Sequence, residues 1–123
     1  MGIWPALALD VLCILVFAIV GRSSHGEASD LLEVLRTAWP FVVGAMLGVL
    51  IGRTWRHPAT LPSGVYVWVS TVVLGMILRV VSGGTAQVSF IIVTTVVLGV
   101  FLLGWRAARR AIQAARIRRS KPA

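Results

Sequence analysis

The sequence contains few acidic residues and a single cysteine. Its 123 residues include four Asp or Glu, and Cys13 lies within an apolar stretch. One cysteine excludes an intrachain disulfide, and no Cys and His residues have the spacing of metal ligands. We therefore expect no crosslink, no metal ion and no cofactor.

Sequence motifs of catalysis are also missing. The sequence has no Gly-rich phosphate-binding loop, no nucleophile elbow and no HExxH motif. His25 and His57 fall on opposite sides of the membrane in the topology argued below, so they would not share a metal ion. We predict that the protein is not an enzyme and has no catalytic residues.

Apolar residues are abundant instead. They make up 58% of the sequence, and the mean hydropathy of +0.90 exceeds that of ordinary soluble domains. A formal net charge of +8 could indicate a nucleic-acid-binding protein, but seven of the twelve Lys and Arg residues lie between Arg106 and Lys121, directly after the last apolar run. This position favours a membrane protein with no nucleic-acid partner.

Four apolar runs predict an all-α fold, a bundle of four transmembrane helices. The predicted spans are residues 3–20, 38–52, 65–81 and 88–105, within one membrane domain of residues 1–105. The first run carries Asp10 and has no basic residue before it, so we interpret it as a permanent span rather than a signal peptide. Residues 106–123 are predicted to form a basic cytoplasmic tail that continues the last helix and contacts anionic lipid of the bilayer.

The second run alone is short for a spanning helix, which needs about 17 to 25 residues. Two interpretations remain open. In one, the helix begins in SDLLEVLRTAWPF, where Asp30 and Glu33 have capping-box spacing and Pro40 kinks the helix. In the other, Leu31 to Leu35 form a short interfacial helix, and a separate span begins near Pro40.

The distribution of basic residues predicts the orientation, because they gather on the cytoplasmic side of membrane proteins. If the tail is cytoplasmic, counting back through four spans places the N-terminus and the connection with Arg53 and Arg56 on the same side. The acidic first connection then lies outside. The expected location is the plasma membrane, with both termini cytoplasmic.

Asp10 interrupts the first apolar run about 10 Å from its inner boundary. A carboxylate at this depth is costly unless it faces the bundle interior and has partners. The expected partner is the hydroxyl of Ser70 or Thr71, at a similar depth in the third span, whereas Arg79 lies further out. The site is either a contact that fixes helix register or a protonatable group in a proton or cation pathway.

Glycines mark candidate positions of close helix packing. Gly44, Gly48 and Gly52 follow GxxxGxxxG spacing, which allows another helix to approach in the same subunit or in a dimer. Gly75 in the third span is a further packing position.

A candidate cluster lies at the outer end of the first span. It comprises Arg22, His25 and Glu27, and a histidine beside an acid could sense pH or relay protons. The simpler interpretation is that His25 is an ordinary loop residue.

The segments DVLCILVFAIVGRSSHG, LRTAWPFVVGAMLGVLIGR and STVVLGMILRVVSG together resemble the bacterial DUF3054 family of small integral membrane proteins, typical of actinobacteria. The resemblance covers Asp10 to about Trp105. It implies a four-helix membrane architecture and supplies no activity, because the function of the family is unknown. The chain is more loosely similar to small multidrug resistance transporters, but its strongly basic tail disfavours the antiparallel homodimer found among them.

Two functions are consistent with these features. The first is a structural or accessory subunit, acting as a homo-oligomer or in a larger membrane complex. The alternative is a small proton- or cation-coupled transporter or channel that uses Asp10.

Overall fold

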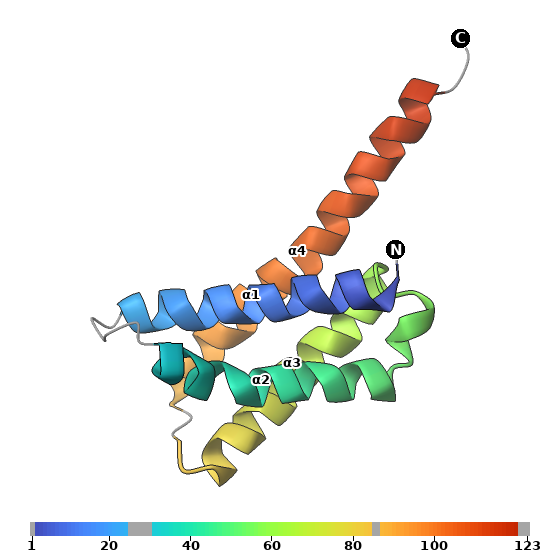
Figure 1. Ribbon diagram of the computed structural model, residues 1–123. Helices are drawn as coiled ribbons and strands as arrows, with labels where there is room; N and C mark the ends of the chain where they lie inside the picture. The colour runs from blue at the N-terminus through green and yellow to red at the C-terminus, as the bar shows by residue number, and fades with distance from the viewer. Residues whose placement is uncertain (1, 25–30, 85–86, 121–123) are drawn as a thin grey trace.

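The computed structural model describes residues 2–24, 31–84 and 87–120. Its architecture is a bundle of four α-helices (Figure 1). The helices are α1 (Ile3–Ser24), α2 (Leu31–Ile51), α3 (Leu61–Val81) and α4 (Val88–Ser120), and the 3-10 turn η1 (Thr54–Arg56) lies between α2 and α3. No strand occurs in these ranges. The predicted all-α four-helix fold is confirmed.

Each helix is long enough and apolar enough to cross a membrane. Large apolar side chains also cover much of the outer surface of the bundle, including Leu12, Val73, Ile92 and Val100. Water-soluble monomers rarely expose apolar surface on this scale. The fold is therefore compatible with a membrane protein.

The second span is one continuous helix. α2 begins at Leu31, contains the buried Pro40 and continues to Ile51. Proline lacks an N–H and therefore removes one hydrogen bond from the helix, but the remaining turns of α2 persist around it. The interpretation with a separate interfacial helix is wrong. Asp30 of the expected capping box lies outside the described residues.

α3 begins four residues earlier than its apolar run. Thr60 caps the helix, because its hydroxyl accepts a 3.4 Å hydrogen bond from the amide of Ser63. Pro62 lies in the first turn, where a backbone N–H has no partner within the helix. The apolar pattern misses this turn because its sequence, LPSG, looks like a loop.

α4 extends well beyond the bundle. Its 33 residues correspond to about 50 Å, more than the roughly 30 Å of a bilayer core. Figure 1 shows its C-terminal half projecting away from the other helices. The predicted helical continuation into the basic tail is confirmed.

The helices pack around a core of apolar side chains, and α2 and α3 contact each other most extensively. The rings of Phe17 and Phe41 lie 5.8 Å apart, and Phe90 lies 6.3 Å from each, so α1, α2 and α4 meet there. At one end of the bundle the start of α1, the α2–α3 connection and the point where α4 leaves the bundle come together (Figure 1). We call this the η1 end.

Candidate functional site

Asp10 belongs to the buried face of α1. It is 1% exposed, and among residues 3–20 of this helix the buried ones are Ala6, Asp10, Ile14, Phe17 and Ala18. Spacings of three and four residues place these side chains on one helical stripe. A carboxylate therefore stands at a position that the helix pattern otherwise fills with apolar groups.

Arg106 of α4 is the partner of Asp10. Arg106 Nη1 donates to Asp10 Oδ1 at 2.8 Å, and Nη2 donates to Oδ2 at 2.9 Å. The indole N–H of Trp105 donates to Oδ1 at 2.9 Å. Arg106 is itself 1% exposed, so this is a buried, bidentate ion pair that joins α1 to α4.

The Arg106 guanidinium also binds the connection between α2 and α3. Its Nε donates to the carbonyl of Pro58 at 3.0 Å, and Nη1 donates to the Leu102 carbonyl, one turn back in α4, at 2.9 Å. Four of the five guanidinium N–H groups are thus used. One side chain therefore links α1, α4 and the connection that precedes α3.

The energetic role of the pair follows from its burial. An isolated Asp or Arg inside a membrane costs about 2.5 to 3.5 kcal/mol on insertion scales. Pairing and hydrogen bonding offset this cost, and removing one partner leaves the other charge buried and uncompensated. The site therefore acts as a clamp that makes the register of α1 depend on that of α4.

The expected contact between Asp10 and the hydroxyls of α3 is not formed. Ser70 donates to the carbonyl of Gly44 at 2.7 Å, and Thr71 donates to Val67 within its own helix at 2.5 Å. Both hydroxyls are thus satisfied by backbone carbonyls. A guanidinium neutralises the carboxylate, which a hydroxyl does not, so Arg106 is the stronger partner.

Arg79 does not join the Asp10 site either. Its Cζ lies 4.5 Å from the centre of the Phe90 ring, near the start of α4. Phe90 lies two residues after the start of α4, whereas Arg106 directly follows the apolar part of this helix. The structure therefore separates Arg79 from Asp10 by most of the bundle length.

The glycines of α2 lie against α3 in the same chain. An added Cβ at Gly44 would lie 3.0 Å from the Ser70 carbonyl oxygen, and one at Gly48 would lie 2.7 Å from Ser70 Cβ. At Gly52 it would meet the ring of Tyr66 at 2.8 Å, and at Gly75 it would overlap the ring of Phe41. These positions allow the close approach of α2 and α3.

The predicted outer cluster is not part of the described site. His25 and Glu27 lie outside the described residues, as does the side chain of Arg22. In the described part of the chain, no group of three or more His, Cys, Asp or Glu residues could hold a metal ion.

Arg106 is the residue that sequence reasoning missed. Seven basic residues follow the last apolar run, and Arg106 is the first of them, so the pattern predicts that it belongs to the tail. Helix length is a signal for it, because Arg106 lies eighteen positions after Val88. This corresponds to about 27 Å of helix, which still falls within a bilayer core. Trp105, Pro58 and Gly64, which surround the guanidinium, could not be found from spacing alone.

The fold and the site define a class, an all-α protein of four membrane-length helices clamped by a buried ion pair. The chain belongs to the family described as "Protein of unknown function (DUF3054)", which matches residues 7–109. The matched range contains both Asp10 and Arg106, and the predicted family is confirmed. No curated protein and no solved structure matches the chain.

Proposed function

We propose that this chain is an integral protein of the plasma membrane with a structural or accessory role and no enzymatic activity. The Asp10–Arg106 pair carries this proposal. Both carboxylate oxygens accept hydrogen bonds from a guanidinium of the same chain, and the group is 1% exposed. A carboxylate held in this way offers no free oxygen to a transported cation and serves to join helices.

The membrane location is supported by the apolar outer surface of four helices that could each cross a bilayer. The orientation is supported by charge. Arg53 and Arg56 lie in the α2–α3 connection at the η1 end, where the basic C-terminal half of α4 also emerges (Figure 1). Cytoplasmic placement of this end follows the positive-inside rule.

Cysteine labelling in cells tests the location and the orientation. In a Cys13→Ala background, Ser82→Cys places a thiol in the α3–α4 connection, and Gln113→Cys places one in the projecting part of α4. A membrane-impermeant maleimide should label Ser82→Cys in intact cells. The same maleimide should label Gln113→Cys after the cell membrane is permeabilised. Labelling of both thiols, or the reverse pattern, in intact cells would contradict the proposed topology.

Flux measurements test the role. The purified chain and its Asp10→Asn variant are reconstituted in liposomes that contain a pH-sensitive dye, and proton entry is followed with and without a sodium gradient. We expect both proteins to match empty liposomes, while Asp10→Asn is less stable. A flux that Asp10→Asn abolishes in a folded protein would reject the accessory role and support the proton- or cation-coupled transporter.

An accessory role requires a partner in the membrane, and we propose either a second copy of the chain or a larger membrane complex. Crosslinking in native membranes, followed by mass determination, tests this part. A chain that migrates as a monomer under crosslinking conditions that capture a known membrane complex would contradict it.

A further inference from the structure

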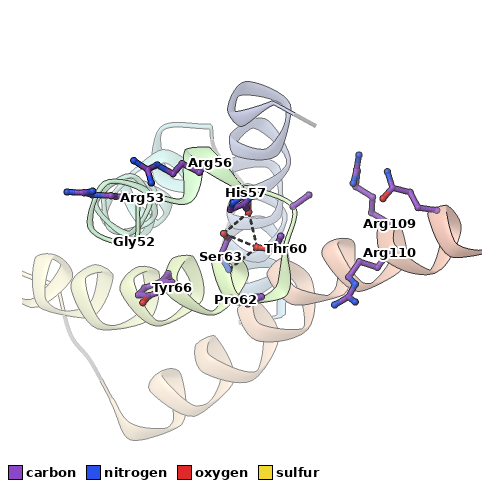
Figure 2. A pocket seen from close by; sticks show the side chains of 12 residues that line it. Gly52, Arg53, Arg56, His57, Thr60, Pro62, Ser63, Tyr66, Arg109 and Arg110 are labelled. Atoms are coloured by element: carbon purple, nitrogen blue, oxygen red, sulfur yellow. Dashed lines mark hydrogen bonds between the residues drawn. The ribbon is translucent and has the colours of Figure 1, made fainter.

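An open pocket of about 820 Å³ lies at the η1 end, between the α2–α3 connection, the start of α3 and α4 (Figure 2). Four arginines contribute to its lining: Arg53, Arg56, Arg109 and Arg110. We call this the basic pocket. We propose that it binds the headgroup phosphate of an anionic phospholipid, one acyl chain of which lies in an adjacent apolar groove.

Among the residues that the structure describes, no acidic side chain balances the charge of the basic pocket. None of its twelve lining residues is acidic, and within the described ranges none of the four arginine side chains makes an ion pair. Asp10 is already paired with Arg106, and Glu33 lies at the other end of α2, about 27 Å from Ile51 along the helix. The N-terminus of α3, which is the positive end of its helix dipole, also lines the pocket. A phosphate group would supply the missing negative charge.

The ion pair positions one wall of the basic pocket. Arg106 is anchored to Asp10 and to the Pro58 carbonyl, and Arg109 and Arg110 follow it by three and four residues. Side chains at these spacings share a helix face. The clamp therefore holds the part of α4 that carries both arginines beside the connection that contains Pro58.

The opposite wall has an unusual backbone. Arg53 adopts a left-handed conformation, with φ 48° and ψ 41°, a region in which glycine is favoured. Figure 2 shows Arg53 and Arg56 on one side of the pocket and Arg109 and Arg110 on the other. His57 and Ser63 lie between them, and the Ser63 hydroxyl donates to the His57 carbonyl at 2.6 Å. This hydrogen bond ties the start of α3 to the α2–α3 connection between the two basic walls.

The apolar groove begins where the basic pocket ends. It has a volume of about 420 Å³ and is lined by Gly48 and Ile51 of α2 and by residues of α3 from Val65 to Leu74. Tyr66 lines both cavities. Along α3 the groove extends about 14 Å, close to half of a bilayer core of roughly 30 Å. Its dimensions suit an acyl chain within one leaflet.

The continuity of the two cavities favours a lipid over a free phosphate. A soluble phosphate would use the basic pocket alone, whereas a phospholipid also covers the apolar groove. Ser70, a polar residue of the groove, already donates its hydroxyl proton to Gly44. The inference rests on the proposed membrane location and is independent of the accessory role.

Native mass spectrometry of the full chain in detergent tests the inference, with dioleoyl phosphatidylglycerol, dioleoyl phosphatidylcholine and inorganic phosphate as probes. The variants are Arg53→Gln/Arg56→Gln and Arg109→Gln/Arg110→Gln. Arg116→Gln/Arg118→Gln is the matched control, because it removes the same charge from α4 beyond the pocket. Val73→Trp fills the groove, and its control is Val100→Trp on the exposed surface of α4. Circular dichroism verifies that each variant is folded.

We expect one phosphatidylglycerol to bind in preference to phosphatidylcholine. Each pocket double variant should weaken this binding about tenfold or more, and Arg116→Gln/Arg118→Gln should weaken it less than about threefold. Val73→Trp should weaken it, whereas Val100→Trp should not. Equal losses in all three arginine double variants would overturn the inference in favour of diffuse attraction to the tail.

Two further results would also overturn it. One is equal binding of the two phospholipids, and the other is tight binding of inorganic phosphate with no effect of Val73→Trp on phosphatidylglycerol. The cysteine labelling described above decides the membrane location separately. A failed lipid experiment therefore rejects the pocket and leaves the proposed location intact.

Discussion

Gly64 of α3 lies so close to the side chain of Arg106 that no methyl group fits between them. A Cβ at Gly64 would lie 2.7 Å from Arg106 Cδ and 2.8 Å from Leu103 Cδ2. The Arg106 stem has little freedom to move aside, because its guanidinium is held by Asp10 and Pro58. The ion pair between α1 and α4 thus depends on a small residue of α3.

Gly64→Ala should therefore destabilise the protein. Overpacking at a rigid contact costs about 1 to 3 kcal/mol. Unfolding in mixed detergent micelles, followed by circular dichroism, measures this change. Gly104→Ala is the control, because no atom lies within 4 Å of its added Cβ. It should leave stability unchanged or raise it by up to about 1 kcal/mol, as expected for Gly→Ala in a helix. Equal effects of the two substitutions would contradict the packing argument.

Trp105→Phe should also lower stability, because it removes the indole N–H that donates to Asp10 Oδ1. A hydrogen bond to a charged group contributes about 1.5 to 3 kcal/mol. The same unfolding measurement applies. Trp4→Phe removes an indole from a residue that is 78% exposed and should have little effect. A Trp105→Phe protein as stable as the wild type would mean that the carboxylate does not need this donor.

Gly48→Ala should weaken the contact between α2 and α3 within one chain. The added Cβ would lie 2.7 Å from Ser70 Cβ and 3.2 Å from the Tyr66 carbonyl oxygen. A loss of about 1 to 3 kcal/mol is expected, with no change in the number of chains per particle by light scattering. If stability were retained while an oligomer dissociated, the glycine face would instead be an interface between subunits.

The helices themselves were predictable, because a bilayer-length apolar segment can satisfy its backbone only as a helix or in a closed barrel. Their ends were less predictable. The first turn of α3 was missed because Pro62 and Gly64 resemble a loop. The sequence alone does not decide whether α2 continues through Pro40, since a proline can either end a helix or be tolerated in it.

The partner of Asp10 was not predictable from spacing. Asp10 and Arg106 are separated by 96 positions, and their contact depends on the depth and rotation of two helices. Successive residues of a helix differ in direction by about 100°, so an error of one position points a side chain elsewhere. Ser70 and Thr71 lie at a suitable depth along the chain, but their hydroxyls bond to backbone carbonyls. By composition alone, Arg106 belongs with the basic residues that follow it.

The central claim is that Asp10 and Arg106 stabilise the bundle as a pair. A double-mutant cycle with Asp10→Leu, Arg106→Met and the combined variant tests it most directly. Leu keeps the branched shape of Asp, and Met keeps the unbranched stem of Arg. Free energies of unfolding are measured for all four proteins in the same micelles.

We expect each single substitution to cost about 3 to 5 kcal/mol, because it leaves one buried charge without its partner. The double variant should cost clearly less than the sum of the two. Some loss should remain, since the Pro58 carbonyl and the Trp105 indole lose their partners. Additive effects of the two substitutions would show that the charges are not coupled, and would contradict the clamp.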